Sequence, residues 1–416
     1  MQTIYVYADF DWLESPRFVG ELSCDSVRGS ETYGFSFDKG WLAEYGDIFL
    51  SEDLMNYPGI QYVREGRDIF GCFSDALPDR WGRTLLNRRE QITASEEKRV
   101  PRRLTSFDYL IGIDDASRMG GFRLASNPGG QFINSDATLR IPPLTNVREL
   151  MRASHEIEAS EEKDSLPSRK WIEQLIHPGT SLGGARPKAS VLDEQGRLTV
   201  AKFPSRKDDY DIAQWEHFCH VMGQKAGIRV AETRTIPGEK HHILLSKRFD
   251  RTDSGTRIHF ASALTLLGLT DGDNASTGFG YPDIVDFIIG HGSDVEQDLD
   301  ELYRRVAFNI IVGNSDDHFR NHGFLLTRKG WKLSPAYDIN PTLSAHQSLL
   351  INRTTDRADL EILLDSAGDY MLSDEKAREI IGQVKTAMKL WRVEARRFSL
   401  PQRDIDTFGH RFDSQL

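Results

Sequence analysis

Residues 313–326 read GNSDDHFRNHGFLL, and they follow an apolar segment, LYRRVAFNIIV, that predicts a buried helix. Asp316 and Asn321 stand five residues apart in this stretch. A predicted strand pair, GFLLTRKGWKLSP, comes next, and Asp338 follows it in the sequence AYDIN. Phosphoryl transfer from ATP needs one carboxylate near the acceptor hydroxyl, and an amide and a second carboxylate that hold Mg²⁺ against the phosphates. The spacing meets that need; the alternative is a polar turn in which Asp and Asn act as caps.

A lysine and a glutamate stand upstream in an order that fits the same chemistry. Lys202 lies in the apolar segment TVAKFP, which predicts a strand, and Glu216 lies on the helix predicted after it. A lysine in such a strand costs stability unless its ammonium group finds a partner. Pairing with a helix glutamate and with the α- and β-phosphates is the protein-kinase arrangement. Taken singly, an edge-strand lysine and a solvated glutamate are the simpler interpretations; their order with Asp316 and Asp338 favours the kinase arrangement.

A glycine-containing turn, TSLGGARPKASVL, precedes the lysine strand. Gly183 and Gly184 would let the backbone approach an anion closely, and Arg186 and Lys188 would add positive charge. The turn does not match the G-x-x-x-x-G-K-[ST] phosphate loop, because an alanine follows Lys188 and the glycines are misplaced. A simple hairpin turn is the alternative interpretation.

The composition is that of a globular protein. Of the 416 residues, 39% are hydrophobic and 28% are charged, and the net charge of −11 argues against a groove that wraps nucleic acid. Cys24, Cys72 and Cys219 form no C-x-x-C pair, so neither a disulfide framework nor a thiolate zinc site is indicated. The chain start lacks a signal-peptide pattern, and no apolar run is long enough to span a membrane. We therefore expect a cytoplasmic protein with no membrane contact.

The order of the predicted elements indicates two lobes. The segments IYVYADF, FVGEL and YGFSF predict short strands, and SFDYLIGIDDASRMGG predicts a helix that ends at Gly120-Gly121. From about residue 260 the chain is mostly helical in pattern. We expect an α+β, two-lobed protein-kinase-like fold with a β-rich N-terminal lobe and an all-α C-terminal lobe. The expected parts are a β-rich N-terminal subdomain at 1–125, a kinase N-lobe with phosphate loop and lysine strand at 126–255, and a helical C-lobe with the catalytic and metal-binding motifs at 256–416.

Several of these motifs together resemble the HipA family of bacterial type II toxin–antitoxin serine/threonine kinases. They are SLGGARPKASV, AKFP, QWEHFCHVMGQKAGIRV, LLSKRFDR, GNSDDHFRNHGFLL and AYDINPT, in that order. FVGELS and FSDALPDRWGR near the start also resemble the N-terminal part of full-length HipA proteins. The resemblance covers most of the chain and is specific to the family, not to a subfamily or a target.

The resemblance implies a role for each matching residue. Asp316 would be the catalytic carboxylate, and Asn321 and Asp338 would hold Mg²⁺. Lys202, oriented by Glu216, would contact the phosphates of ATP. The other ATP-binding residues that it implies are Gly183, Gly184, Ala185, Arg186, Pro187 and Lys188 over the phosphates, Lys247, Arg248 and Phe249 in the hinge beside adenine, and His318 and Tyr337 in the pocket.

The resemblance also implies regulation by autophosphorylation at Ser181. Almost two added negative charges in a loop that cradles phosphates would repel ATP. Thr180 and Ser190 are neighbouring candidates for the modification, and a turn cap is the alternative role of Ser181. The chain departs from some relatives at two places: Lys247 stands where they have an acidic residue, and Arg186-Pro187 replaces Gln-Glu.

The leading hypothesis is an ATP- and Mg²⁺-dependent serine/threonine protein kinase, the toxin of a toxin–antitoxin pair. The resemblance implies a cytoplasmic protein substrate, such as an aminoacyl-tRNA synthetase or another translation factor. It also implies a HipB-like helix-turn-helix antitoxin as partner, so that DNA is contacted only indirectly, through the antitoxin. The alternatives are a small-molecule kinase of related fold and a pseudokinase that acts as co-repressor with its antitoxin.

Overall fold

The computed structural model describes residues 2–27, 30–135, 141–163, 165–176, 184 and 186–416. The chain forms two compact units, one made of residues 1–208 and 245–261 and the other of residues 209–244 and 262–416. It passes between them after Asp208, and again within strands β9 (His242–Lys247) and β10 (Phe260–Ser262). The three-part division at 1–125, 126–255 and 256–416 stays a prediction.

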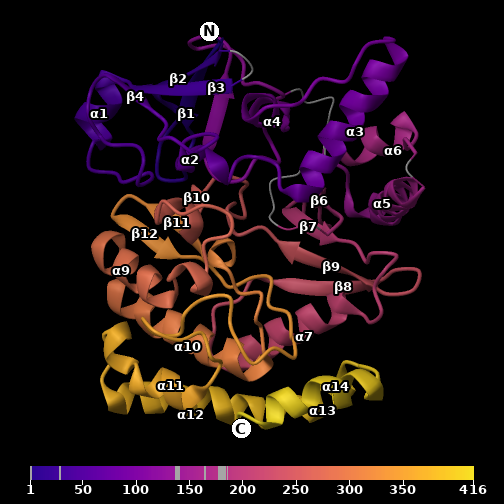
Figure 1. The fold of residues 1–416 in the computed structure, drawn as a ribbon, viewed down its shortest axis with the longest axis vertical. Helices are drawn as coiled ribbons and strands as arrows, with labels where there is room; N and C mark the ends of the chain where they lie inside the picture. The colour runs from indigo at the N-terminus through magenta and orange to yellow at the C-terminus, as the bar shows by residue number, and fades with distance from the viewer. Residues whose placement is uncertain (1, 28–29, 136–140, 164, 177–183, 185) are drawn as a thin grey trace. The chain divides into compact units, whose positions relative to one another are not determined.

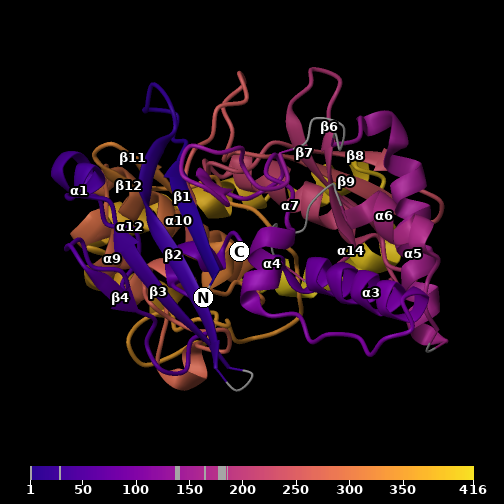
Figure 2. The same ribbon diagram turned by 90° about the horizontal axis from the view of Figure 1, so that it is seen from above.

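The first unit opens with a five-stranded antiparallel sheet, in which β1, β2 and β3 lie side by side (Figures 1 and 2). Along β1, residues Ile4, Val6 and Ala8 are buried and alternate with more exposed neighbours, so one face of the sheet carries a core. Phe35 and Phe73 pack in this core with ring centroids 5.8 Å apart. In the order β4-β3-β2-β1-β5, the strands are β1 (Gln2–Ala8), β2 (Arg17–Val27), β3 (Ser30–Phe37), β4 (Ile60–Tyr62) and β5 (Phe122–Ala125).

Some helices of the first unit begin at side-chain caps. Asp79 caps α3 by accepting a hydrogen bond from the Gly82 N–H at 2.8 Å, and Thr105 and Asp108 form a capping box on α4. The helices are α1 (Lys39–Tyr45), α2 (Gly71–Ser74), α3 (Arg80–Glu96), α4 (Ser106–Gly112), α5 (Val147–Glu162) and α6 (Arg169–Ile176), with a 3₁₀ turn at Leu144–Asn146. After them, β6 (Lys188–Leu192) and β7 (Leu198–Lys202) form an antiparallel hairpin.

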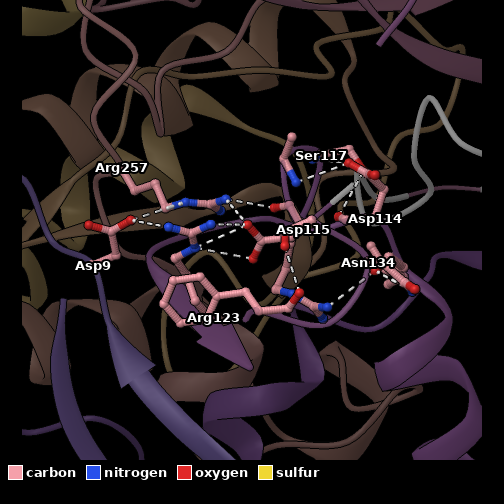
Figure 3. Close-up of polar contacts among 12 residues, drawn as sticks. Asp9, Asp114, Asp115, Ser117, Arg123, Asn134 and Arg257 are labelled. Carbon is pink, nitrogen blue, oxygen red and sulfur yellow. Dashed lines mark hydrogen bonds and ion pairs between the residues drawn. The ribbon is translucent and has the colours of Figure 1, made fainter. Parts of the chain in front are cut away.

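A buried ion-pair network ties segment 245–261 to the sheet of this unit (Figure 3). Asp115, which is 2% exposed, accepts hydrogen bonds from Arg123 Nε at 3.0 Å and from Arg257 Nη2 at 3.1 Å. Asp9, just after β1, lies 3.3 Å from the same Arg123 and 3.7 Å from Arg257. Because buried charges are stable only when they are paired, these contacts explain why residues 245–261 belong to the first unit.

The second unit is mostly helical and is built around α10 (Val295–Val312), which is buried along most of its length. Arg411 of the last helix donates a hydrogen bond to the Ile310 carbonyl oxygen at 2.8 Å, near the end of α10. The other elements are α7 (Ile212–Lys225), β8 (Thr233–Pro237), α8 (Ala263–Leu266), α9 (Tyr281–His291), β11 (Gly323–Thr327), β12 (Gly330–Leu333), α11 (Leu360–Asp365), α12 (Asp374–Met388), α13 (Trp391–Arg397) and α14 (Gln402–Asp413), with 3₁₀ turns at Ala275–Thr277, Phe319–Asn321 and Ala367–Tyr370.

The α+β class expected from the sequence is confirmed. The description of the C-terminal lobe as all-α needs one correction, because β11 and β12 form an antiparallel hairpin within it. Leu326 and Trp331 face each other in that hairpin and are buried, so the burial of apolar side chains stabilises the strands. Within the described ranges, no helix has the length and apolar character needed to cross a membrane.

Candidate active site

The loop that carries Asp316 starts at a fixed point, the end of α10. Gly313 ends this helix with φ +68°, and a Cβ there would approach the Thr342 carbonyl oxygen to 2.4 Å. Thr342 donates to the Gly313 carbonyl oxygen from its backbone N–H at 3.0 Å and from its hydroxyl at 2.6 Å. Its hydroxyl also lies 2.7 Å from Ser315 Oγ. The glycine therefore permits a close approach that anchors the first residues of the loop.

Asp316 is an exposed residue, whereas Asn321 is 8% exposed. The Asp316 carbonyl oxygen accepts hydrogen bonds from the His318 N–H and from Asn321 Nδ2, both at 3.0 Å. Since Asn321 uses its amide nitrogen inside the loop, its Oδ1 atom is the one suited to ligate a cation. The loop thus holds Asp316 and Asn321 in a fixed relation, as their five-residue spacing predicts.

Asp338 lies close enough to Asp316 to influence its ionisation. The pKa of Asp316 is raised, first because the surrounding protein removes solvent and then because Asp338 and Asp317 carry like charge, although His318 acts in the opposite direction. Asp338 has φ +58°, a left-handed conformation that is unusual for a residue with a side chain. Its Oδ1 accepts a hydrogen bond from Asn340 Nδ2 at 3.1 Å.

The donor set suits Mg²⁺. A carboxylate from Asp338 and an amide oxygen from Asn321 are hard oxygen ligands, and Mg²⁺ in phosphate-transfer sites takes one or two protein ligands beside substrate phosphates. In the part of the chain that the structure describes, no group of three or more His, Cys, Asp or Glu residues could hold a metal by itself. Two protein ligands would leave the remaining coordination positions of a Mg²⁺ ion to water or phosphate oxygens.

Two other predicted residues of the second unit, Tyr337 and His318, lie beside or in this loop. Tyr337 donates its hydroxyl to the Arg320 carbonyl oxygen at 2.5 Å. His318 is half-buried, and its Nδ1 atom has no hydrogen-bond partner among the residues that the structure describes. Glu216 is 4% exposed on α7. A small cavity behind the loop is lined in part by Asn321 and Tyr337.

The lysines predicted to contact phosphates lie in the first unit, on the β6–β7 hairpin. Lys188 pairs with Lys202 in the strand register, so the two residues stand directly opposite each other. Lys188 is buried, and its Nζ atom lies 3.0 Å from Asp79 Oδ2. Lys202 is half-buried at the end of β7. Lys202 and Glu216 belong to different compact units, and their pairing stays a prediction.

Only part of the predicted phosphate turn is described. Gly184 has φ +90°, and a Cβ at this residue would lie 3.0 Å from the Lys188 Nζ atom. Arg186 forms an ion pair with Asp208, and the Pro187 carbonyl oxygen accepts a hydrogen bond from the Phe203 N–H at 2.8 Å. Ser181, Gly183 and Ala185 lie outside the described residues.

The three predicted hinge residues have different environments. Lys247 forms an ion pair with Asp253 at 2.6 Å. Arg248 is 4% exposed and donates to Asp250 and, at 2.6 Å, to the Ser117 carbonyl oxygen. Its guanidinium group is therefore used inside the first unit, and a contact with adenine would have to come from its backbone. Phe249 lies beside Phe260, with ring centroids 6.0 Å apart.

Three acidic residues at these sites were missed by the sequence analysis: Asp79, Asp208 and Asp317. Asp79 and Asp208 neutralise Lys188 and Arg186, which the sequence analysis assigned to phosphate. Burial raises the pKa of Asp317, but His322 and Tyr281 more than offset this effect and hold it below its usual value. The doublet Asp316-Asp317 followed by His322 was a usable signal, because a carboxylate that is not used in catalysis can pair with a nearby histidine.

Comparisons with known proteins give the family. A family model described as the HipA-like C-terminal domain matches residues 180–391, just over half of the chain. The chain is 20% identical over 347 residues to the serine/threonine-protein kinase toxin HipA of Shewanella oneidensis, covering 77% of this chain and 72% of that protein. It is 25% identical over 180 residues to a candidate kinase of Haemophilus influenzae, covering 38% of this chain and 52% of that protein. The chain thus spans about half the length of some curated relatives that it matches.

A solved structure supports the same fold. The structure of Shewanella oneidensis HipA with HipB and operator DNA matches 99% of this chain and 95% of its own with a TM-score of 0.66. Its identity of 14% shows a shared fold and nothing finer. Together with the family model, which covers the Asp316 loop and Asp338, these findings lead to one conclusion: the chain belongs to the HipA-like C-terminal domain family.

Proposed function

We propose that this protein is an ATP-dependent serine/threonine protein kinase that acts as a HipA-like toxin. The observation that carries the proposal is the arrangement of Asp316, Asn321 and Asp338. Asp316 offers an exposed carboxylate, and the other two residues offer oxygen ligands within the same unit. Kinases use this set to orient the acceptor hydroxyl and to hold the metal.

In this mechanism, Asp316 orients the hydroxyl of the substrate and accepts its proton as the oxygen attacks the γ-phosphorus atom. Bound Mg²⁺ would neutralise charge that develops on the phosphates. Asn321 and Asp338 would hold that ion, and Lys202 would contact the α- and β-phosphates. His318 lies two residues after Asp316 and would line the nucleotide pocket with Tyr337.

The proposal includes regulation and partners. The kinase would be inactivated by autophosphorylation of Ser181, because a phosphate on this residue would repel ATP. A HipB-like helix-turn-helix antitoxin would bind the protein and carry it to DNA, as the complex of the Shewanella oneidensis protein with HipB and operator DNA suggests. The substrate would be a cytoplasmic protein of the translation machinery.

The acceptor class can be tested directly. Purified wild-type protein and Asp316→Asn are each incubated with γ-labelled ATP, Mg²⁺ and bacterial lysate, and acid-precipitated protein is separated from small molecules. We expect label on serine or threonine of precipitated protein for the wild type, and a loss of orders of magnitude in Asp316→Asn. Label confined to small molecules would instead favour a metabolite kinase.

A further inference from the structure

Asp317 points into the second unit, whereas its neighbour Asp316 points to solvent. Asp317 is 3% exposed, and one of its oxygens, Oδ2, accepts three hydrogen bonds. The donors are Tyr281 Oη at 2.6 Å, Asn309 Nδ2 at 2.7 Å and His322 Nε2 at 2.9 Å. They come from the start of α9, from α10 and from the residue that ends the Asp316 loop, so one carboxylate joins three parts of the unit.

The hydrogen bonds continue from Asp317 through three asparagines to Asp338. Asn309 Oδ1 accepts from Asn314 Nδ2 at 3.2 Å, and Asn314 Oδ1 accepts from the Asn340 N–H at 3.3 Å. Asn340 Nδ2 then donates to Asp338 Oδ1 at 3.1 Å. Each of the first two amides uses its nitrogen toward Asp317 and its oxygen toward Asp338, so the chain has a single consistent direction.

Asp338 at one end of this chain, and Asp316 next to Asp317 at the other end, both need support. The Asp316 carboxylate is exposed, and its position depends on the backbone of a loop. Asp338 has a left-handed backbone conformation, which persists in a residue with a side chain only when surrounding contacts hold it. A buried polar chain in which most donors and acceptors are matched is rigid, and it can fix the distance between its ends.

We propose that Asp317 is a positioning residue, which acts through Asn309, Asn314 and Asn340 to fix the Asp316 loop relative to Asp338. Asp317 itself touches neither nucleotide nor substrate. The expected effect on kcat rests on the proposed function. The inference also predicts a change in metal affinity, which can be measured without turnover.

Two tyrosines of the second unit provide a matched pair of variants. Tyr281 and Tyr370 are both fully buried, and each donates a hydrogen bond of 2.6 Å, Tyr281 to Asp317 and Tyr370 to the Ile351 carbonyl oxygen. Tyr281→Phe and Tyr370→Phe therefore each delete one buried hydrogen bond and leave the ring in place. Tyr281→Phe should lose more thermal stability than Tyr370→Phe, because its hydroxyl donates to a charged acceptor. Only Tyr281→Phe should disturb the site.

The experiment measures two quantities on wild type, Tyr281→Phe, Tyr370→Phe and Asp317→Asn. The first is kcat with KM for ATP, and the second is Mn²⁺ affinity in the presence of ATP, followed by electron paramagnetic resonance. We expect Asp317→Asn to lower kcat about a hundredfold and Tyr281→Phe about tenfold, since small misplacements of reacting groups have effects of this size. Mn²⁺ affinity should fall about tenfold in Asp317→Asn, with KM for ATP changing less than kcat.

The outcomes separate the inference from the proposed function. Two results together would overturn the positioning role. The first is that Tyr281→Phe and Tyr370→Phe have equal kcat and equal Mn²⁺ affinity. The second is that Asp317→Asn matches wild type in both quantities at equal folded fraction. Weaker Mn²⁺ binding in Asp317→Asn supports it even if phosphoryl transfer proves insensitive to Asp316→Asn. Phosphoryl transfer that is insensitive to Asp316→Asn would overturn the kinase assignment but not the positioning role of Asp317.

Discussion

Removing one member of the buried pair between Asp79 and Lys188 should destabilise the first unit strongly. The Lys188 Nζ and Asp79 Oδ2 atoms are 3.0 Å apart, and the two side chains are 3% and 4% exposed. Breaking such a pair leaves a buried charge without its partner, which costs about 3–5 kcal/mol. We expect Lys188→Met to lower the free energy of unfolding by about this amount at neutral pH.

The loss in Lys188→Met should shrink as the pH falls. Burial raises the pKa of Asp79, and Lys188 only partly offsets that effect. When the folded-state pKa lies above the unfolded value, the stabilisation is fully present at low pH and is lost as the pH rises through the folded pKa. Removing Lys188 raises the pKa of Asp79 further. The loss of unfolding free energy in Lys188→Met relative to wild type is therefore largest above the pKa of Asp79 in the variant, and smallest near pH 4.

A double-mutant cycle measures the coupling. Asp79→Asn keeps a good helix cap, but it leaves Lys188 buried opposite Lys202, and like charges that face each other across strands are destabilising. The double variant removes both charges of the pair and should recover most of the loss.

Urea unfolding followed by tryptophan fluorescence provides the assay, because Trp81 is 4% exposed in the first turn of α3, next to Asp79. Arg17→Met is the control, since Arg17 and Glu44 form an ion pair with half-exposed side chains, and little change is expected. If the double variant loses as much unfolding free energy as the two single variants added together, the two residues are not coupled and the reasoning is refuted.

Three further predictions concern pH, modification and metal. Burial raises the pKa of Asp114 to about 6, so the stability that its neutral form contributes is present at low pH and is lost as the pH rises through about 6. Asp114→Asn should therefore gain unfolding free energy over wild type as the pH rises from 4 to 7, and parallel curves of stability against pH would contradict this. Ser181→Ala should remove most self-phosphorylation in site mapping by mass spectrometry, whereas full occupancy at Thr180 or Ser190 would refute the assignment. Chelation of Mg²⁺ should abolish phosphoryl transfer and leave the thermal unfolding temperature of the nucleotide-free protein unchanged; a lower unfolding temperature would indicate a structural metal instead.

The elements with strong periodicity could be predicted from the sequence. FVGEL and YGFSF lie in β2 and β3, and LYRRVAFNIIV lies in α10. The segment IYVYADF covers most of β1 and runs two residues past its end at Ala8. The predicted helix over SFDYLIGIDDASRMGG is too long, because α4 ends at Gly112. Asp114 accepts hydrogen bonds from the N–H groups of Ala116 and Ser117, which competes with continuation of the helix.

The partners of charged residues were harder to predict than the residues themselves. Asp316, Asn321 and Asp338 share a local sequence region, so their spacing already indicated a common site. Lys188 and Asp79 are 109 residues apart in the sequence. Neither periodicity nor motif spacing can predict a contact between residues with such a large sequence separation. The sequence therefore predicted a phosphate contact for Lys188, and its buried carboxylate partner became visible only in the folded chain.

Phosphoryl transfer by the purified protein tests the central claim most directly. Wild type and Asp316→Asn, matched for thermal stability and for phosphate already present in the intact mass, are supplied with γ-labelled ATP and Mg²⁺, and transferred phosphate is counted over time. The account predicts transfer by the wild type and a loss of orders of magnitude in Asp316→Asn. Equal transfer by both proteins would contradict it.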